Sequence, residues 1–290
     1  KGVRAPVSLR VNPDVDAKTH AKIATGAAET KFGIPASRAR EIYAEAAAMP
    51  VLKVCGSDMH IGSQITALAP FDAAFSVMGD LLDVLRGDGH QISHVDLGGG
   101  LGVPYDDAVE DPPLPQDYAA LVARHSNRLG CQVIVEPGRA IAANAGVLLT
   151  RVVHRKEGEA KTFIVADAAM NDLIRPTLYD AHHEIRPVRA PGAKPTETVD
   201  VVGPVCETGD YLALGRPMPR TDRGDLLAIM SAGAYGAVQS CTYNTRTLAA
   251  EVLVSGDRFH VVRRPMPPEE QIARESVPDW IAAPAEPTTV

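Results

Sequence analysis

The first half of the chain alternates between short apolar segments and longer segments whose apolar residues recur every three to four positions. The short segments predict strands at residues 7–11, 51–61, 92–97 and 132–135. Helical periodicity between them predicts helices over 37–49 and 71–86, the second with one apolar face made of Phe71, Phe75, Met78, Leu82 and Leu85. The pattern is that of a repeated βα unit.

Such alternation predicts a parallel sheet, which closes either as an open doubly wound sheet or as an eight-stranded barrel. In both closures the functional groups lie at the carboxyl ends of the strands. Polar segments follow the predicted strands at residues 12–13, 60–64, 98–100 and 136–139. Four units make half of a (β/α)8 TIM-type barrel, so a barrel would require about four further units on the N-terminal side.

The pattern changes after residue 145. Strand-like segments separated by Pro and Gly turns predict an antiparallel β domain over residues 146–264. Its strands are expected at 146–153, 162–167, 198–202, 225–230, 249–254 and 258–263. The predicted fold class is therefore α/β, with the C-terminal half of a barrel over 1–145, the C-terminal antiparallel β domain, and a C-terminal helix and tail over 265–290.

Composition and charge narrow the classes of partner. Of the 290 residues 45% are apolar, as in ordinary globular proteins, and the net charge is −7. Without a run of Lys or Arg, neither nucleic acid nor an anionic membrane is an expected partner. The longest uncharged stretch, residues 226–245, contains Gly, Ser, Gln and Asn, which favours a buried strand and loop over a membrane helix. Four widely spaced cysteines favour a cytoplasmic location.

Two of the polar segments carry candidate binding groups. Gly98, Gly99 and Gly100 allow backbone N–H groups to approach an oxyanion such as phosphate, although a flexible βα turn explains this motif equally well. In the segment 136–139, Glu136 could pair with a protonated ring nitrogen and Arg139 could hold a substrate carboxylate. A surface Glu–Arg ion pair is the alternative.

His60 and Ser63 follow the second predicted strand. A flat imidazole can stack on a flat cofactor and a serine hydroxyl can bind phosphate, while a structural histidine remains an alternative. No metal site is expected, because His60 has no paired histidine and only one candidate carboxylate nearby. No Gly-x-Ser-x-Gly segment supports a serine hydrolase. In the β domain, Cys206 on a Pro- and Gly-containing loop could be an acid or a nucleophile, although most lone cysteines are buried small residues.

Seven segments in order resemble those of the fold-type III pyridoxal-phosphate decarboxylases, most closely the members that act on diaminopimelate. They span nearly the whole chain: 30–34, 60–64, 96–102, 136–139, 171–179, 203–210 and 232–236. The resemblance implies a pyridoxal 5′-phosphate cofactor. It also implies decarboxylation of meso-2,6-diaminopimelate to L-lysine and CO₂, the last step of lysine biosynthesis.

The same resemblance implies roles for individual residues. His60 and Cys206 would be catalytic, His60 by stacking on the pyridoxal ring and Cys206 by delivering the proton that replaces CO₂. Glu136 would keep the ring nitrogen protonated, which makes the ring a stronger electron sink. The phosphate would be bound by Ser63, Gly98, Gly99, Gly100, the backbone of Glu136, Pro137, Gly138 and Arg139, and the hydroxyl of Tyr235. The substrate would be bound at its far carboxylate by Arg139, Arg175 and Tyr179 and at its distal ammonium by Glu207, with Tyr235 as a further substrate-binding residue.

The same resemblance also indicates the substrate and the assembly. Family members that act on ornithine or arginine typically carry Cys-Asp where this chain has Cys206-Glu207, and they need no far-end carboxylate site. The family builds each active site from two subunits, so a homodimer with shared sites is implied. Two alternatives stay open: a decarboxylase of ornithine or arginine, and a catalytically silent homologue that acts as a binding or regulatory subunit.

No segment matches the Schiff-base lysine of the family, which lies early in the barrel. The eight lysines of the chain are Lys1, Lys18, Lys22, Lys31, Lys53, Lys156, Lys161 and Lys194. Lys53 lies at the start of its predicted strand, opposite the end that carries His60. We therefore expect the Schiff-base lysine on an N-terminal segment of about 130 residues, on this or a separate chain, and expect activity to require it.

Overall fold

The computed structural model describes residues 2–17, 19, 25, 31–108, 111–190 and 192–281. Thr30 of the first family-like segment, the lysines Lys1, Lys18 and Lys22, and residues 282–290 of the predicted tail lie outside the described residues. The chain divides into two compact units. Unit 1 comprises Lys1–Leu149, Tyr179–Ala190 and Leu226–Tyr235, and unit 2 comprises Thr150–Leu178, Pro191–Asp225 and Gly236–Val290.

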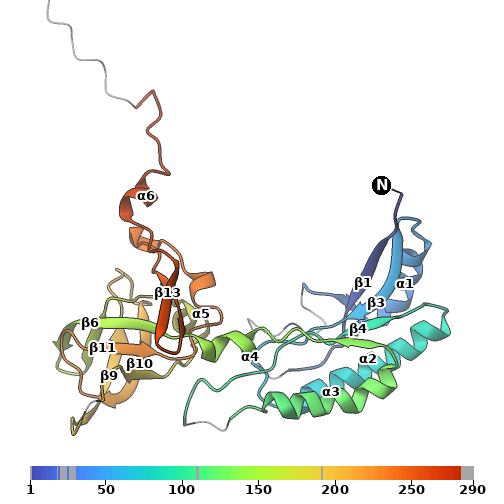
Figure 1. The fold of residues 1–290 in the computed structure, drawn as a ribbon, viewed down its shortest axis with the longest axis horizontal. Coiled ribbons are helices and arrows are strands. Elements are labelled where there is room, and N and C mark those ends of the chain that lie inside the picture. The colour runs from blue at the N-terminus through green and yellow to red at the C-terminus, as the bar shows by residue number, and fades with distance from the viewer. Residues whose placement is uncertain are drawn as a thin grey trace, which may run out of the picture. The chain divides into compact units, whose positions relative to one another are not determined.

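A parallel sheet of five strands forms the centre of unit 1 (Figure 1). The order is β2-β1-β3-β4-β5, with β1 Ala5–Asn12, β2 Ile34–Pro35, β3 Leu52–Asp58, β4 His94–Asp96 and β5 Gln132–Ile134. The four predicted strands are confirmed, and β2 is an addition to them. Strand β3 ends three residues before its predicted end, because its register partner β4 ends at Asp96, opposite Asp58.

Helices cover one face of this sheet (Figure 1). They are α1 Ala39–Ala48, which follows the 3₁₀ turn Ala36–Arg38, α2 Ala69–Gly87 and α3 Pro115–Leu129. The predicted apolar face of α2 is confirmed, since each of its five residues is at most 1% exposed. The residues of α3 were not predicted. This helix begins with Pro115, the Asp117 carboxylate accepts the Leu114 amide at 3.0 Å, and it ends at Gly130, whose φ of 58° suits glycine.

The other face of the parallel sheet is polar. Arg10, Asp58 and Asp96 are register partners across β1, β3 and β4, so their side chains lie in one row. The row beneath contains Ser8, Gly56 and His94, and the Ser8 hydroxyl and His94 Nε2 are 2.7 Å apart. A Cβ at Gly56 would overlap both side chains, so glycine is required for this contact. Charge therefore lies on the sheet face opposite the helices.

The remaining elements of unit 1 follow β5 and return from later in the chain. They are the short helix α4 Arg139–Ala142, the 3₁₀ turn Ala143–Ala145, and the antiparallel pair β8 Ile185–Pro187 and β11 Leu226–Ile229. Just before β8, His183 is fully buried, and its Nδ1 is 2.8 Å from the Met230 carbonyl oxygen.

Unit 2 is built mainly from strands in the order β10-β9-β7-β6. They are β6 Leu148–Glu157, β7 Thr162–Ala166, β9 Thr196–Val202 and β10 Tyr211–Pro219, with the short helix α5 Arg175–Tyr179. The expectation of purely antiparallel pairing is wrong at one place, because β7 and β9 are parallel. Strand β10 was missed because it contains Gly215, Pro217 and Pro219, which are typical of turns; register shifts at Ala213 and Arg216 accommodate them.

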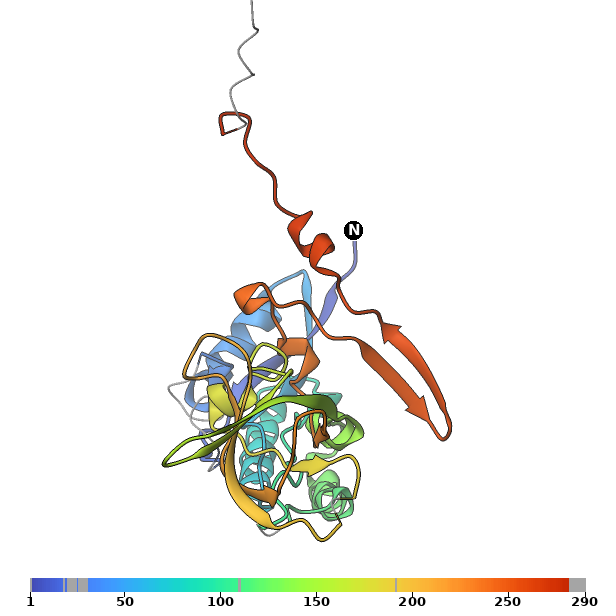
Figure 2. The same cartoon turned by 90° about the vertical axis from the view of Figure 1, so that its left-hand side faces the viewer.

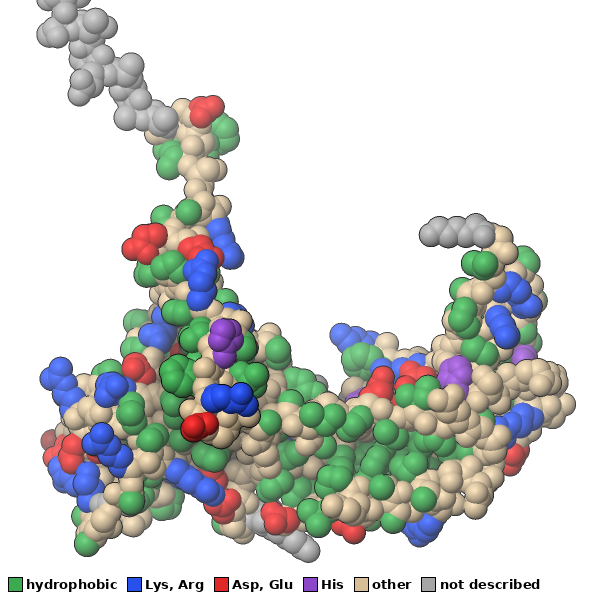
Figure 3. Space-filling view, viewed as in Figure 1, with side chains coloured by type: hydrophobic (Ala, Val, Ile, Leu, Met, Phe, Trp, Pro, Cys, Tyr) green, Lys and Arg blue, Asp and Glu red, His purple; other side chains and the backbone are tan. Residues whose placement is uncertain are grey.

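A two-stranded antiparallel hairpin and a short helix end the described chain (Figure 2). These are β12 Glu251–Ser255, β13 Arg258–Arg263 and α6 Pro268–Ile272, preceded by 3₁₀ turns at Ala237–Gln239 and Tyr243–Thr245. Hydrophobic side chains lie among charged ones over the hairpin (Figure 3), and Leu253, Val254 and Phe259 are each at least 65% exposed. Within the described ranges, no helix combines the length and apolarity needed to cross a bilayer.

Candidate functional site

The segments that follow β3, β4 and β5 meet at one edge of the parallel sheet. The Met59 amide donates to the Asp96 carbonyl at 3.0 Å, and the Ile65 amide donates to the Gly100 carbonyl at 2.9 Å. On the other side, the Glu136 amide donates to the Gly98 carbonyl at 2.8 Å. The structure thus brings together the three predicted segments 60–64, 98–100 and 136–139 through their backbones.

The glycines between these segments are required by close packing. A Cβ at Gly98, Gly99 or Gly100 would overlap the carbonyl oxygen of Met59, Glu136 or Gly62, respectively. Two of the three amides already donate within the chain: Gly98 to Asp96 Oδ1 at 2.8 Å and Gly99 to His60 Nδ1 at 3.2 Å. Among the described residues, the Gly100 amide has no acceptor. Of the three glycine amides predicted to bind phosphate, only that of Gly100 is therefore available to a ligand.

His60 is held as a neutral imidazole. Because Nδ1 accepts the Gly99 amide, the ring proton of the neutral form lies on Nε2. Burial lowers the pKa of His60, and the nearby Arg10 guanidinium lowers it further. Arg10 also donates to the His60 carbonyl at 3.2 Å, which ties the backbone of this segment to β1. The arrangement presents an uncharged flat ring suited to stacking.

Arg139 is the central cation of this edge. It is only 6% exposed and begins α4. Its Nη2 donates to Ser63 Oγ at 2.9 Å and its Nη1 to the Tyr105 hydroxyl at 2.6 Å. The ring of Tyr235 lies 4.7 Å from its Cζ. The structure therefore brings Arg139, Ser63 and Tyr235 together, and adds Tyr105, which the sequence analysis did not single out.

Each of these partners of Arg139 is neutral, and it makes no ion pair with any described residue. A buried guanidinium without a counter-ion is costly, because its desolvation is not offset by a nearby negative charge. An external oxyanion that reached Arg139, Ser63 and the Gly100 amide would supply that charge. The residues present thus fit an anionic group such as a phosphate or a carboxylate.

Tyr235 is presented by a strained turn. Its φ is 57°, a left-handed conformation that non-glycine residues rarely adopt. The preceding Gly233 lies so close to α4 that a Cβ would overlap the Ala142 carbonyl oxygen. Close packing of this turn on α4 brings the Tyr235 ring beside Arg139.

Three carboxylates gather near the same edge. Burial raises the pKa of Asp58 to about 6, and Asp96 and Glu136 add to the rise, while Arg10 opposes it. The side chain of Glu136 is exposed, as expected of a group that would meet a ligand.

Asp58 makes the stability of the chain depend on pH. Because its folded pKa of about 6 exceeds the ordinary 3.8, the folded chain binds more protons than the unfolded chain between these values. Stability contributed by Asp58 is therefore lost as pH rises from about 4 to about 6. We expect Asp58→Asn, which cannot ionise, to gain stability relative to the parent chain over this window. The gain in Tm should reach a few degrees above about pH 6.5, since ~1 kcal/mol corresponds to about 2–4 °C.

Thermal unfolding followed by circular dichroism at several pH values checks this. Asp111→Asn, which changes an exposed carboxylate, is the matched control and should differ from the parent chain equally at every pH. A constant difference for Asp58→Asn as well would contradict the assignment.

In unit 2, the predicted residues Cys206 and Glu207 lie on a loop closed by Asp210. The Asp210 carboxylate, 2% exposed, accepts the amides of Val205 at 2.6 Å and Met170 at 2.7 Å. Cys206 is exposed. The Tyr243 hydroxyl donates a hydrogen bond to Glu207, and this bond together with the Glu207 charge raises the pKa of Tyr243. The loop thus presents an accessible thiol beside a carboxylate of fixed orientation.

Arg175 begins α5 and is 5% exposed. Its helix is joined to the Cys206 loop, because the Thr177 hydroxyl donates to the Gly209 carbonyl at 2.5 Å. The structure therefore joins the helix that begins at Arg175 to the loop that carries Cys206 and Glu207. Tyr179, the last residue of α5, is half-buried and belongs to unit 1.

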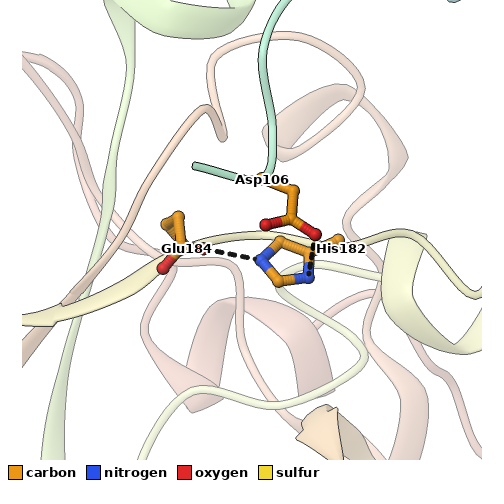
Figure 4. A group of neighbouring side chains, drawn as sticks. All are labelled: Asp106, His182 and Glu184. Atoms are coloured by element: carbon orange, nitrogen blue, oxygen red, sulfur yellow. Dashed lines mark hydrogen bonds and ion pairs between the residues drawn. The ribbon is translucent and has the colours of Figure 1, made fainter. Parts of the chain in front are cut away.

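A cluster of Asp106, His182 and Glu184 in unit 1 has ligand atoms within 4.8 Å of one another (Figure 4). His182 Nδ1 is 3.5 Å from Asp106 and Nε2 is 2.9 Å from Glu184, so the ring lies between the two carboxylates. A protonated imidazole would satisfy both carboxylates, and the cluster does not require a metal ion.

Comparisons with known proteins agree with this geometry. Residues 2–143 match the family described as "Pyridoxal-dependent decarboxylase, pyridoxal binding domain". The chain is 50% identical over 280 residues to a diaminopimelate decarboxylase of Zymomonas mobilis and 53% identical over 276 residues to that of Pseudomonas aeruginosa. These alignments cover 97% and 95% of the chain and 66% of each relative. The chain thus spans slightly less than two thirds of the length of these relatives.

A solved structure of diaminopimelate decarboxylase from Helicobacter pylori, complexed with L-lysine, matches with a TM-score of 0.88 and 36% identity. The match covers 94% of this chain and 67% of that one. Together with the parallel sheet of unit 1, this likeness confirms the predicted fold class, part of a TIM-type barrel followed by a β domain. From the identity and coverage of these matches, the chain belongs to the family of pyridoxal-dependent diaminopimelate decarboxylases.

Proposed function

We propose that the protein decarboxylates meso-2,6-diaminopimelate to L-lysine and CO₂ with pyridoxal 5′-phosphate. The observation that carries this proposal is the buried Arg139, which lies beside Ser63 and has no counter-ion among the described residues, in a chain about half identical to diaminopimelate decarboxylases. When bound, the cofactor supplies an electron sink for the bond that breaks as CO₂ leaves. The remaining chemistry belongs to the chain.

Unit 1 would bind and orient the cofactor. Arg139 and Ser63, together with the available Gly100 amide, would hold an oxyanion, either the cofactor phosphate or the substrate carboxylate. The neutral His60 ring would stack on the pyridine ring without placing a positive charge against it. The exposed Glu136 carboxylate would hold the proton on the ring nitrogen. The glycines place no side chains at this edge, so Arg139, His60 and Glu136 can approach the ligand together.

Residues of the segment 175–207 would recognise the substrate and complete the reaction. Arg175 would bind the far carboxylate with Tyr179, and Glu207 would bind the distal ammonium. Cys206 would deliver a proton to the carbon that has lost CO₂. We further propose a cytoplasmic homodimer in which Cys206 and Glu207 of one subunit complete the site of the other.

The lysine that binds the cofactor aldehyde is proposed to lie outside these 290 residues. Of the described lysines, Lys53 lies at the opposite end of β3 from His60, and Lys31 and Lys156 lie over the rings of Phe32 and Phe163. Lys161 pairs with Asp200, and Lys194 pairs with Asp222 and Asp225. Borohydride reduction of the protein with bound cofactor, followed by peptide mass spectrometry, would identify the modified lysine. A modified Lys53 would overturn this part of the proposal.

The activity itself is tested by incubating the protein, together with the segment proposed to carry the cofactor lysine, with pyridoxal 5′-phosphate and meso-diaminopimelate, and measuring lysine and CO₂ by mass spectrometry. We expect both products in equal amounts, and little turnover of ornithine or arginine, because neither presents a second carboxylate to Arg175. Preferential turnover of ornithine or arginine would change the substrate assignment. Cofactor binding without any turnover would favour the alternative of a silent binding subunit.

A further inference from the structure

Arg139 is held by two uncharged partners, Ser63 and Tyr105. Its Nε and Nη2 both donate to Ser63 Oγ, at 3.3 and 2.9 Å, and its Nη1 donates to the Tyr105 hydroxyl at 2.6 Å. A guanidinium carries five N–H donors. Ser63 and Tyr105 therefore fix its plane and leave one donor on each Nη for a ligand. Because neither partner is an anion, the positive charge of Arg139 stays available.

The Tyr105 ring is itself held in place. It packs edge-on against His183, with ring centroids 5.1 Å apart and planes at 76°. On the N-terminal side, Gln64 binds both backbone groups of Val103, donating to its carbonyl at 2.7 Å and accepting its amide at 3.2 Å. The direction of the Tyr105 hydroxyl is thus set from both the sheet edge and the segment before β8.

The two residues after Tyr105 are joined to the same segment. Asp106 faces His182, whose ring also faces Glu184 (Figure 4). Asp107 pairs with Arg186 on β8. Three successive residues, 105–107, therefore contact side chains of residues 182–186. Tyr105 contacts this segment through its ring, whereas Asp106 and Asp107 face a histidine and an arginine.

We propose that Tyr105 is a positioning residue of the Arg139 oxyanion site, and that residues 182–186 fix it there. This proposal rests on the proposed function. The proposal extends that function by adding a residue that orients the Arg139 guanidinium without neutralising its charge. The oxyanion is the cofactor phosphate or the substrate carboxylate, and the binding and kinetic measurements below distinguish these two ligands.

The test is Tyr105→Phe, which removes the hydroxyl and keeps the ring against His183. Pyridoxamine 5′-phosphate carries the phosphate but no aldehyde, so its binding needs no lysine. We expect its Kd, measured by calorimetric titration, to rise about tenfold or more, as for loss of a hydrogen bond to a charged group. Binding of pyridoxamine, which lacks the phosphate, should not change. If instead the KM for meso-diaminopimelate rises about tenfold at constant kcat, the oxyanion is the substrate carboxylate.

Tyr118→Phe is the matched control. The Tyr118 hydroxyl is buried and has no hydrogen-bond partner in the described part of the chain, and its ring packs on Phe71, so its removal should leave both affinities and kcat unchanged. The proposal is overturned if Tyr105→Phe leaves both the Kd and the KM within twofold of the parent values. It is also overturned if pyridoxamine binding weakens as much as pyridoxamine 5′-phosphate binding.

Failure of the proposed function gives a different result. A parent protein that does not bind pyridoxamine 5′-phosphate would contradict the cofactor assignment. Titration with inorganic phosphate would then still test Tyr105, and equal affinities of the parent and Tyr105→Phe proteins would overturn its positioning role.

Discussion

Replacing Cys206 with alanine is expected to lower the kcat of decarboxylation by about 10²–10⁴-fold, the range typical of a lost general acid. Cys206 is exposed on the loop closed by Asp210, and its neighbour Glu207 is oriented by Tyr243. The substitution removes the proton donor and leaves the loop closure intact, because Asp210 binds backbone amides and not the thiol. Cofactor affinity and Tm should therefore remain close to the parent values.

Steady-state kinetics with meso-diaminopimelate checks this expectation. Cys241→Ala is the matched control, since Cys241 is also an exposed free thiol of unit 2 and has no proposed role. Its kcat should equal that of the parent protein. Unchanged turnover of Cys206→Ala would remove Cys206 from the acid role. Equal losses in both variants would indicate a general sensitivity to cysteine replacement.

The meeting of the three polar segments could be predicted from sequence, because the carboxyl ends of parallel strands lie at one edge of a sheet. His60 lies at the end of one predicted strand, and Gly98 and Glu136 directly follow two others, so their proximity required only the strand order. The function of the glycines was harder to predict from the sequence. Whether a Gly–Gly–Gly segment binds an anion or packs against neighbouring carbonyls depends on distances that the sequence does not contain.

Tyr105 shows what sequence patterns miss. It lies several residues after the glycines, in a segment without helical or strand periodicity, and its partner His183 is distant in sequence. Its position close behind the glycine segment was a weak signal. Strand β10 was missed for a related reason: Pro217 and Pro219 predict turns locally, while pairing with β9 decides the structure.

Gly99→Ala is expected to disrupt the sheet edge strongly. The added Cβ would overlap the Glu136 carbonyl oxygen, a backbone atom whose residue is already fixed by its bond to Gly98. Overpacking of this kind costs about 1–3 kcal/mol, or roughly 2–12 °C in Tm for a chain of this size. The forced separation would also weaken the bond from the Gly99 amide to His60 and displace Glu136, so the affinity for pyridoxamine 5′-phosphate should fall about tenfold or more.

The matched control is Gly87→Ala at the end of α2, where a Cβ meets nothing within 4 Å. Alanine favours a helix over glycine, so this variant should be as stable as the parent chain or slightly more stable. Thermal unfolding and calorimetric titration of both variants give the two readouts. Loss of stability in Gly99→Ala with full ligand affinity would show that the glycines serve packing alone. Loss of affinity at unchanged Tm would show that the sheet edge yields to the methyl group and that Gly99 contributes chiefly to ligand binding.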